Sequence, residues 1–557
     1  MLLDLDKIKI HFSKIRDDED YRSLIEKLHH KYKELKHLEI PALTFNDYKR
    51  VYEDGDRKSY ENPYFLRREI MNVNAILALL YPENSEYINN LQSVIWEICN
   101  EYYWGLPYHV EFDKNESAFI DLFAAETGCA LAEIQWLLKD RLYPHINARI
   151  TAELDRRIFR SFATRDFWWF DAVHNWASVC GGNVAIAMMR AKPELFAEMK
   201  PKFDKIMASF LSGYDDDGMC KEGIGYWYYG FGSFLIYADM LQKFSDGQYN
   251  YFVDEKVKEI ALFGNKAYLG ETCCVSFSDG EMNTEADLAM YQLMCQKYPD
   301  KIKPVSIEKS FIRYDRWMYF FRTFIYHKGT PTETAVTESV NEVIYQDGGE
   351  QYVKKTNAYS FAVKAGNNDE PHNHNDIGGF IVAKDDTQIL CDLGAGLYTR
   401  QYFDNDTRYS IFCNSSYGHS VPIVCGKPQA TGKQFFGKLS VQEDAVTVDL
   451  ADAYDIPELS KLKRTFALRE KEIVLADEFD LQDICERLIS TYPFRSVTEG
   501  ELEVKGVRLR YDESIWEAIV KTEMHTKHSG EEIAVYVCDF IAKREHNGCF
   551  SLCIAFD

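Results

Sequence analysis

The N-terminal half of the chain carries apolar side chains at helical spacing. Stretches such as "SEYINNLQSVIWEICNEYYW" (85–104), "DLFAAETGCALAEIQWLLKDRL" (121–142) and "FGSFLIYADMLQKF" (231–244) repeat an apolar residue every three or four positions. This spacing places the apolar side chains on one face of a helix. Segments rich in Gly, Pro and Asp, such as "YPENS" and "YDDDGMCKEG", separate them. The pattern predicts many helices joined by short connections.

The pattern changes after the Lys- and Pro-containing stretch "KYPDKIKPVSIEKS" (297–310). Beyond it, short runs such as "NAYSFAVKAG" and "KLSVQEDAVTVDL" alternate apolar and polar residues, and the steps "KDD" and "QED" are typical of hairpin turns. The sequence therefore predicts a multidomain α+β protein, with a helical domain over residues 1–315 and an antiparallel β-sandwich domain over residues 316–557. Helical periodicity alone does not distinguish a toroid of helical hairpins from a solenoid.

Length, charge and aromatic content narrow the classes of partner. A chain of 557 residues exceeds what one hydrophobic core usually organises, which indicates about two to four domains. The formal net charge of -24 argues against nucleic acid and anionic membrane surfaces, because both require a cationic patch. Aromatic residues make up 14% of the chain. They either line a sugar-binding cleft, with Trp104 as a candidate substrate contact, or fill the core.

The N-terminal stretch and the cysteines indicate a cytoplasmic protein. Asp4 and Asp6 stand where a signal peptide would carry a basic start and an apolar run. The sequence contains no run of about 18 apolar residues, the length that would predict a transmembrane helix. The 14 cysteines lack the spacing of a disulfide framework, and Cys129 and Cys180 lie among apolar helical neighbours. We therefore expect reduced core thiols in a cytosolic protein.

Two histidines and two asparagines alternate in "EPHNHNDIGGF" (370–380). In a strand, His372 and His374 would point to the same side, whereas in a loop they would only be neighbours. Asp392 ends an apolar run in "ILCDLGAG", and His419 lies in "NSSYGHSVPIV". Two imidazoles and one carboxylate are a ligand set that zinc accepts. The alternative is a set of hydrogen-bonded histidines that brace loops.

Several segments occur in an order that resembles a known family. In the C-terminal half they are "HNHNDIGGFIVAKDDTQILCDLGAGLYTR" and "NSSYGHSVPIVCGKPQ". In the N-terminal half they are "VIWEICNEYYWGLPYH", "DLFAAETGCALAEIQWLL", "DFWWFDAVHNWASVCGGNVAIAM" and "DGMCKEGIGYWYYG". Together they resemble the heparinase II/III-like polysaccharide lyases over most of residues 60–430. The last stretch of the chain adds only a compatible strand pattern.

The resemblance implies an N-terminal (α/α) toroid followed by antiparallel β-sheets, with the active site between them. It also implies cleavage of uronic-acid-containing glycans by β-elimination, which needs a donor facing the substrate carboxylate, a base and an acid. Asn175 in "HNWAS" matches the family's carboxylate-neutralising Asn, Tyr226 in "EGIGYWYYG" its catalytic Tyr, and His372 its catalytic His. Without the resemblance, Asn175 would be interpreted as a helix cap and Tyr226 as aromatic packing.

Further site residues follow from the same resemblance. His374, Asp392 and His419 match a structural zinc site of some relatives, where the metal would brace the loop carrying the catalytic histidine. His174 stands where many relatives show a second Asn, and it is either the base or a packing residue. Arg408 in "NDTRYS" is a candidate ligand of the substrate carboxylate, with a surface ion pair as the alternative.

Two other functions remain open from the sequence. Helical toroids also carry glycoside hydrolases, which use paired carboxylates. Such a pair can come from Asp215, Asp216, Asp217 and Glu222. A non-catalytic carbohydrate-binding protein is the third interpretation, although binding alone does not require the predicted catalytic Tyr and His. In each case the expected partner is a carbohydrate, and for a lyase it is a uronic-acid-containing oligosaccharide or polysaccharide.

Overall fold

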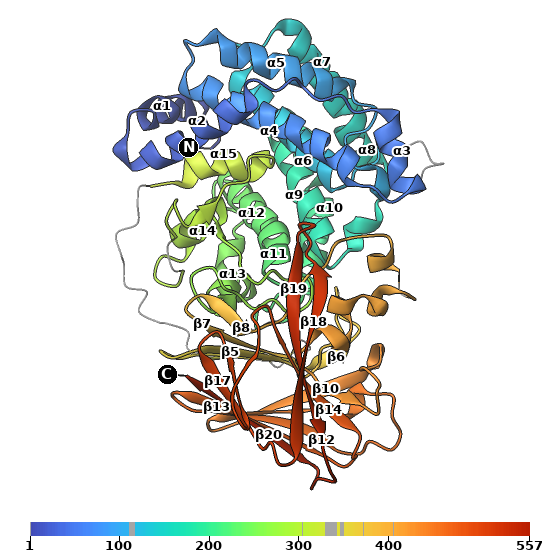
Figure 1. Ribbon diagram of the computed structural model, residues 1–557. Helices are drawn as coiled ribbons and strands as arrows, with labels where there is room; N and C mark the ends of the chain where they lie inside the picture. Colours follow the sequence, from blue (N-terminus) through green and yellow to red (C-terminus); the bar gives the residue numbers. More distant parts are fainter. Residues whose placement is uncertain are drawn as a thin grey trace. The chain divides into compact units, whose positions relative to one another are not determined.

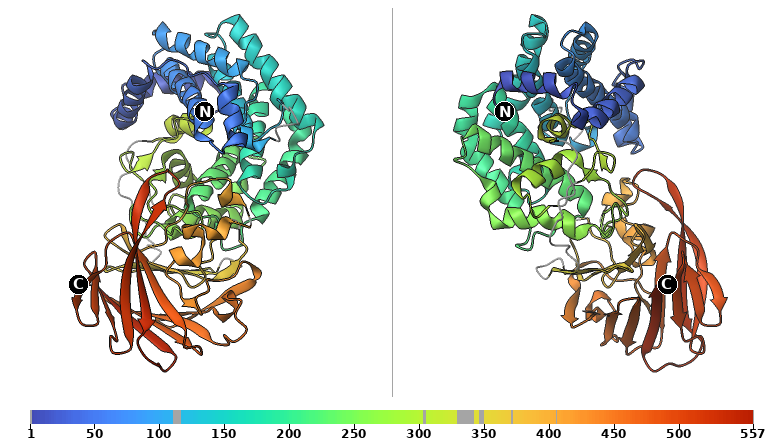
Figure 2. Two further views of the ribbon diagram at one scale, coloured as in Figure 1. Left: turned by 45° about the vertical axis from the view of Figure 1, so that its right-hand side comes forward. Right: turned by 90° about the vertical axis from the view of Figure 1, so that its left-hand side faces the viewer.

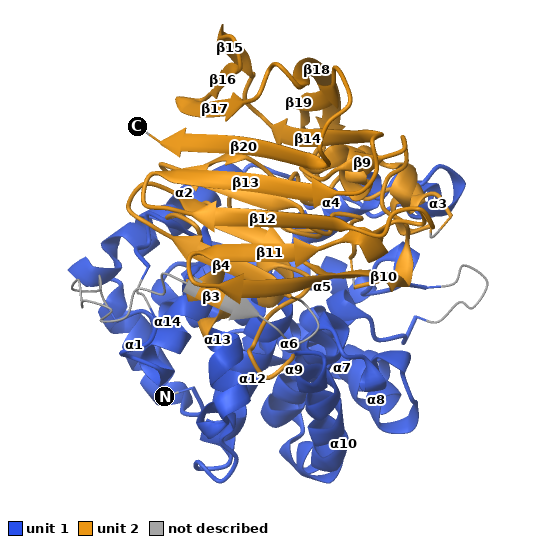
Figure 3. Cartoon of the chain, turned by 90° about the horizontal axis from the view of Figure 1, so that it is seen from below, with its two compact units in different colours: residues 1–214, 228–261, 285–337 blue, residues 215–227, 262–284, 338–557 orange. Residues whose placement is uncertain are grey.

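The chain folds into a helical part and a β-rich part. The computed structural model describes residues 2–110, 117–302, 305–328, 342–345, 350–370, 372–404 and 406–556. Contacts divide the chain into two compact units (Figure 1 and Figure 3). Unit 1 comprises Met1–Tyr214, Tyr228–Ala261 and Glu285–Thr337, and unit 2 comprises Asp215–Trp227, Leu262–Thr284 and Glu338–Asp557.

Unit 1 consists mainly of helices, and the stretches with apolar stripes form α5, α6 and α12 as predicted. In chain order its helices are α1 (Leu5–Ile15), α2 (Arg22–Leu35), α3 (Phe45–Glu53), α4 (Lys58–Leu80), α5 (Ser85–Asn100), α6 (Leu122–Leu138), α7 (Pro144–Leu154), α8 (Arg160–Thr164), α9 (Asn175–Ala191), α10 (Pro193–Ser212), α12 (Gly232–Phe244), α14 (Leu288–Lys297) and α15 (Trp317–Tyr326). Helix α13 (Glu255–Ala267) begins in unit 1 and ends in unit 2. Within the described part of the chain, no helix is both long enough and apolar enough to span a bilayer.

The long helices of unit 1 form a ring of hairpins. Helices α4, α6, α9, α12 and α15 contact one another in turn, and α15 closes back on α4. Helices α5, α7 and α10 pack against α4, α6 and α9 of this ring, and α14 packs against both α12 and α15. In Figure 2 the helices follow one another round an arc from blue through cyan to green. Because the contacts return to the first helix, the helical part is a toroid, the alternative that helical periodicity left open.

A buried ion cluster joins three helices of this ring. Glu133 on α6 accepts hydrogen bonds from Arg190 on α9 (3.1 Å) and Arg322 on α15 (3.0 Å). The indole N–H of Trp317 donates to the same carboxylate at 3.1 Å. Burial would raise the pKa of Glu133, but the two guanidinium groups outweigh it and lower that pKa. The carboxylate is therefore ionised and fully paired at neutral pH.

Replacing Glu133 by alanine should destabilise the protein by about 3 to 5 kcal/mol, because it leaves two buried guanidinium groups without their partner. Thermal and urea unfolding would measure the loss. The matched control is Asp155→Ala, which removes a partly exposed partner of Arg160 at 3.0 Å and of Lys192 at 3.7 Å and should change stability by less than about 1 kcal/mol. Equal effects of the two variants would contradict a structural role for the buried cluster.

Unit 2 is built on antiparallel sheets. A nine-stranded sheet has the order β15 (Arg495–Thr498), β16 (Glu501–Val504), β17 (Val507–Tyr511), β20 (Cys549–Phe556), β13 (Glu472–Phe479), β12 (Leu462–Leu468), β11 (Ala445–Asp449), β10 (Gly432–Gln442) and β6 (Gly366–Asn368). A four-stranded sheet has the order β18 (Trp516–Thr526), β19 (Glu532–Ala542), β14 (Ile484–Ser490) and β9 (Ile423–Val424). A five-stranded sheet has the order β3 (Glu342–Tyr345), β4 (Gln351–Lys355), β5 (Ser360–Lys364), β7 (Phe380–Lys384) and β8 (Thr387–Leu390).

The five-stranded and nine-stranded sheets pack together as a sandwich. Strands β12 and β13 bury alternate residues, so that one face of the larger sheet is apolar. Phe466 on β12 contacts Phe361 on β5 and Phe380 on β7, with ring centroids 4.8 and 4.9 Å apart. Figure 3 shows β20, β13, β12, β11 and β10 side by side in the larger sheet. The predicted β-sandwich is therefore confirmed.

Both predicted hairpin turns form. In the "KDD" step, Asp385 and Asp386 connect β7 to β8 with φ angles of 50° and 58°, the left-handed pair required by a two-residue type I′ turn. In the "QED" step, Glu443 has a φ of 50° between β10 and β11. Asp and other short polar residues tolerate this conformation better than apolar ones, which is why the turns could be predicted.

The boundary between the two parts differs from the predicted one at residue 315. Helix α15 lies beyond that boundary but belongs to unit 1, and all of its 10 residues are buried. A fully buried apolar run carries no period that separates a helix from a strand. Conversely, residues 262–284 belong to unit 2. They are tied to the β7–β8 turn by backbone N–H groups of Thr272 and Cys273, which both donate to Asp386 at 2.8 Å.

Candidate active site

A buried carboxylate, Asp279, joins two histidines and two tyrosines within unit 2. His372 Nδ1 lies 2.5 Å from Asp279 Oδ2, and His374 Nε2 lies 3.1 Å from Oδ1. Tyr398 donates a hydrogen bond of 2.8 Å to Oδ2, and Tyr402 donates to Oδ1. Each carboxylate oxygen therefore serves one imidazole and one phenol.

Close contact between two loops holds Asp279 in place. The backbone N–H of Ala395 donates to the carbonyl oxygen of Gly280 at 3.1 Å. Gly394, with a φ of 63°, permits this approach. A Cβ atom at that position would lie 1.8 Å from the carbonyl oxygen of Gly280. Only glycine fits there, and the loop after β8 thereby positions the residue that precedes Gly280.

His372 lies in the loop between β6 and β7 rather than in a strand. The strand alternative for the His-Asn segment is therefore wrong. His372 has a φ of 56°, in the left-handed region, which costs a non-glycine residue about 1 to 2 kcal/mol. Strained backbone of this kind clusters at functional sites, where the surrounding structure holds it in place.

Tyr226 approaches the same group of side chains. It ends the short helix α11 (Ile224–Tyr226), directly before a π-helical turn over Trp227–Phe231. Its ring centroid is 4.5 Å from that of His372, and its hydroxyl oxygen is 3.1 Å from that of Tyr398. Because the hydroxyl of Tyr398 donates a hydrogen bond to Asp279, the oxygen of that hydroxyl can accept a hydrogen bond from Tyr226. The structure thus brings together two of the predicted catalytic residues, Tyr226 and His372.

Hydrogen bonds set the charges of this cluster. Burial would raise the pKa of Asp279, but the bonds from His372 and His374 hold that pKa well below its usual range. Burial would lower the pKa of His372, but the bond to Asp279 raises it overall. Burial also raises the pKa of Tyr398 far above its usual value, with the neighbouring Tyr226 and Asp279 adding to the shift. At neutral pH Asp279 is therefore ionised and Tyr398 is a neutral phenol.

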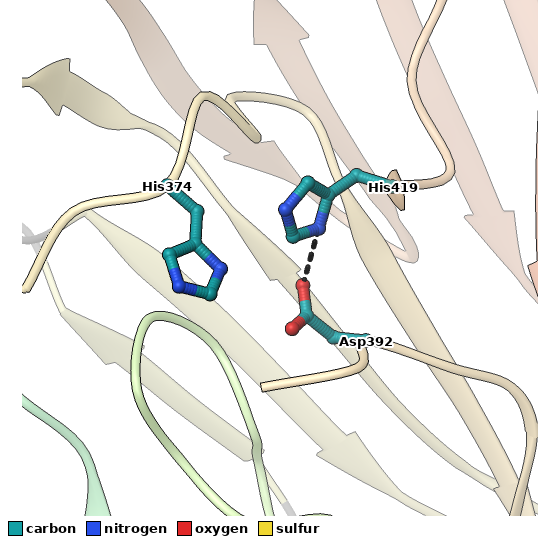
Figure 4. A group of neighbouring side chains, drawn as sticks. All are labelled: His374, Asp392 and His419. Carbon is teal, nitrogen blue, oxygen red and sulfur yellow. Dashed lines mark hydrogen bonds and ion pairs between the residues drawn. The ribbon is translucent and has the colours of Figure 1, made fainter. Parts of the chain in front are cut away.

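His374, Asp392 and His419 form a buried cluster beside this group (Figure 4). One ligand atom from each residue lies within 4.8 Å of the others. His419 Nδ1 lies 2.9 Å from Asp392 Oδ2, and its Nε2 lies 2.7 Å from the carbonyl oxygen of Cys413. Within the described ranges, Nδ1 of His374 is buried without a hydrogen-bond partner. Such a nitrogen beside a carboxylate and a second imidazole fits a divalent metal ion.

Comparison with known proteins identifies the fold. No protein-family model matches the chain, and no curated protein matches its sequence. The structure of heparinase III matches with a TM-score of 0.64 at 12% identity, covering 99% of this chain and 91% of that one. A mutant heparan sulfate lyase from Pedobacter heparinus matches with a TM-score of 0.59 at 11% identity, covering 90% of this chain and 77% of that one. Chondroitin AC lyase from Streptomyces coelicolor A3, in complex with chondroitin sulphate, matches with a TM-score of 0.53 at 9% identity, covering 99% and 82%.

This chain has the polysaccharide-lyase fold. The combination of a helical toroid and antiparallel β-sheets, predicted from the sequence, is therefore confirmed. Because only about a tenth of the aligned residues are identical, the similarity concerns the backbone fold. The chemistry of this chain has to be argued from its own side chains.

The other predicted catalytic residues of this lyase fold lie in unit 1. Asn175 is the first residue of α9, and His174 is its N-cap residue without a side-chain capping bond. The two side chains face each other, with His174 Nδ1 3.3 Å from Asn175 Oδ1. Next to them the ring of Trp168, which is 54% exposed, lies 4.7 Å from that of Trp176. Aromatic side chains of this kind, with one face exposed beside polar groups, are typical of interfaces.

Arg408 and Trp104, the two predicted substrate contacts, are both buried and donate hydrogen bonds to backbone carbonyl oxygens of the protein. Arg408 is buried, and its guanidinium donates to the carbonyl oxygens of Asn373 (3.0 Å) and Tyr402 (2.8 Å). It braces the loop that carries His372 and is not the surface ion pair considered as the alternative. Trp104 is fully buried, and its indole N–H donates to the carbonyl oxygen of Ile98 at 2.9 Å. It has no exposed face on which a sugar ring can stack, so the core interpretation applies to it.

Several residues of the site were missed in the sequence. Tyr398 lies within a segment of the family resemblance and Tyr402 lies two residues after its end, and this position is the signal that could have found them. Asp279 lies in "SFSDGEM" in the predicted helical half, where nothing in the sequence indicates a role for it.

His525 on β18 is a further buried residue that the sequence did not single out, and its Nε2 has no partner among the residues that the structure describes. Burial, together with nearby His374, lowers the pKa of His525 to about 4, so that it is neutral at pH 7.

The carboxylates considered for a hydrolase lie in the loop before α11. Asp215 forms an ion pair of 2.9 Å with Lys221, and Asp217 accepts the backbone N–H of Met219 at 3.1 Å. Glu222 lies near enough to His372 to contribute to the raised pKa of that imidazole. Asp215 and Asp217, two of the four carboxylates considered for a hydrolase, therefore make contacts within their own loop.

Proposed function

We propose that the protein is a lyase that cleaves uronic-acid-containing oligosaccharides or polysaccharides by β-elimination. The observation that carries the proposal is the meeting of Tyr226, His372 and Tyr398 around the ionised Asp279. A phenol and an imidazole within reach of one another are groups that can move a proton at neutral pH. The lyase fold supports the same class of reaction.

The reaction breaks the C5–H and C4–O bonds of the uronate and forms a double bond between C4 and C5. We assign removal of the C5 proton to Tyr226 in its phenolate form, and the phenol formed in this way delivers that proton to the departing glycosidic oxygen. His372, when protonated, places a positive charge beside the ring of Tyr226 and favours its phenolate form. Since Asp279 holds Nδ1 of His372, Nε2 is the atom that can donate to the substrate carboxylate.

Zinc fits the cluster of His374, Asp392 and His419, because Nδ1 of His374, which has no partner in the described part of the chain, completes a ligand set of two imidazoles and one carboxylate. When bound, the ion would tie the loop before β7 to the segments that carry the other two ligands. No proton transfer in the proposed elimination passes through it. His372 lies two residues from His374 in the same loop, so that ordering this loop orders the catalytic imidazole.

The decisive experiment is a screen for unsaturated products. Alginate, hyaluronate, chondroitin, heparan and pectic oligosaccharides would each be incubated with the protein while ultraviolet absorbance is recorded. Only elimination creates a double bond conjugated with the carboxylate. New reducing ends without absorbance would indicate the hydrolase alternative. Tight binding without turnover of any uronide would indicate a carbohydrate-binding protein.

Asn175→Ala should lower kcat by about 10²- to 10³-fold with a smaller change in KM, because an amide donor matters most when charge builds up on the substrate carboxylate. Steady-state kinetics on the best substrate of the screen would measure both constants. Asn175→Asp preserves the shape but replaces the donor with a negative charge, and we expect at least as large a loss. A rise in KM with unchanged kcat would show uniform binding and remove Asn175 from this role.

A further inference from the structure

We propose that Asp279 is the positioning residue that couples the metal site to the proton-transfer groups. One carboxylate holds both the metal ligand His374 and the pair His372 and Tyr398. The catalytic half of this inference rests on the proposed function. The metal half does not, because it can be measured without a substrate.

The first step concerns the two nitrogens of His374. Both oxygens of Asp279 accept hydrogen bonds from tyrosine hydroxyls, so the contact of 3.1 Å between Oδ1 and His374 places the ring proton of His374 on Nε2. Nδ1 then carries the lone pair that a metal ion requires. In Figure 4 one nitrogen of this ring points toward Asp392 and His419, and the other points away. Nδ1 is also the atom that is buried without a partner among the residues that the structure describes. Asp279 thus supplies the carboxylate of a carboxylate–histidine–metal arrangement.

The second step concerns the other oxygen of Asp279. Oδ2 lies 2.5 Å from His372 Nδ1 and accepts the hydroxyl of Tyr398 at 2.8 Å. Tyr398 in turn contacts the hydroxyl of Tyr226 at 3.1 Å. The ring orientation of His372 and the hydroxyl direction of Tyr226 therefore depend on the same group that sets the tautomer of His374.

An amide at this position cannot replace the carboxylate. Asp279 accepts on both oxygens, and each is shared by one imidazole and one phenol. Asparagine has one accepting oxygen, and its NH₂ group would face two donors on the other side. Either His374 must turn its proton onto Nδ1, which blocks the metal, or His372 and Tyr398 lose their acceptor. The carboxylate is needed for both sites at once.

The test compares Asp279→Asn with Asp386→Asn. Asp386, in the β7–β8 turn, is the matched control because its carboxylate also accepts several hydrogen bonds, but from Thr272 and Cys273. Zinc alone would be titrated into metal-free protein in competition with a chelating dye, and thermal melting would be recorded with and without zinc. Asp279→Asn should bind zinc about 10- to 100-fold more weakly, while Asp386→Asn should bind it as the wild type does.

A second set of variants keeps the inference testable if Asp279→Asn does not fold. Asp279→Glu retains a carboxylate and should recover part of the zinc affinity. Tyr398→Phe leaves the carboxylate and the metal ligand in place, so it should lower kcat at saturating zinc with little change in KM or in zinc affinity. Unchanged kcat in Tyr398→Phe would overturn the catalytic half.

The outcomes separate this inference from the proposed function. If the wild type and Asp279→Asn bind zinc equally well, the inference is overturned whatever the protein catalyses. If the wild type binds no zinc, the inference and the metal site are both overturned. If zinc binding is lost in Asp279→Asn but no uronide is ever cleaved, the role of Asp279 toward the metal is upheld while the proposed function fails.

Discussion

Replacing Tyr226 by phenylalanine should lower kcat by about 10²- to 10⁴-fold, the contribution of a positioned general acid or base. The change removes one hydroxyl oxygen and keeps the ring that packs beside His372. The fold and the affinity for substrate should therefore stay close to those of the wild type. Initial rates of product absorbance, with substrate binding measured by calorimetry, would check both expectations.

Tyr229→Phe is the matched control for this prediction. Tyr229 lies three residues away, but its hydroxyl donates to Glu126 at 2.9 Å in unit 1. We expect this variant to keep most of its activity. If Tyr226→Phe instead retains more than about a tenth of the wild-type rate, well short of the loss expected for a proton carrier, Tyr226 does not carry the proton and one of the neighbouring tyrosines becomes the candidate.

Removing the divalent metal should lower thermal stability and activity together. Binding to the folded form alone stabilises it, and the proposed ligands come from segments that are far apart in the chain. Elemental analysis of protein purified without chelator should find about one equivalent of metal, as expected for a single site of three protein ligands. His374→Ala should reproduce both losses, and added zinc should not restore them.

His30→Ala is the control for a histidine unrelated to the site, because its side chain is 78% exposed on α2. It should melt like the wild type and retain its metal. The metal prediction fails if the native protein carries no divalent ion and His374→Ala melts at the wild-type temperature. In that case His374, Asp392 and His419 are a hydrogen-bonded cluster that braces loops, the alternative that the sequence left open.

Local features of the chain were predictable from the sequence because they depend on neighbouring residues. Helices α5 and α6 follow from apolar stripes with their own polar caps, Asn84 and Asp121, which accept backbone N–H groups at the first turn. The β7–β8 hairpin follows from two adjacent aspartates that tolerate positive φ. The order of helices and then strands follows from the change of period along the chain. The similarity of a few segments to a lyase family added the fold, which the solved structures confirm.

Relations between distant residues were decided only by the tertiary structure. Asp279 meets His372 and Tyr398 from positions roughly a hundred residues away, and no local pattern records such a contact. Exposure is equally non-local. Arg408 and Trp104 look like surface ligands in the sequence but are buried, because the loops and helices packed over them are set elsewhere in the chain. The residue types and their order thus determined the helices, the strands and several site candidates, whereas burial and long-range hydrogen bonds determined which of those candidates lie together.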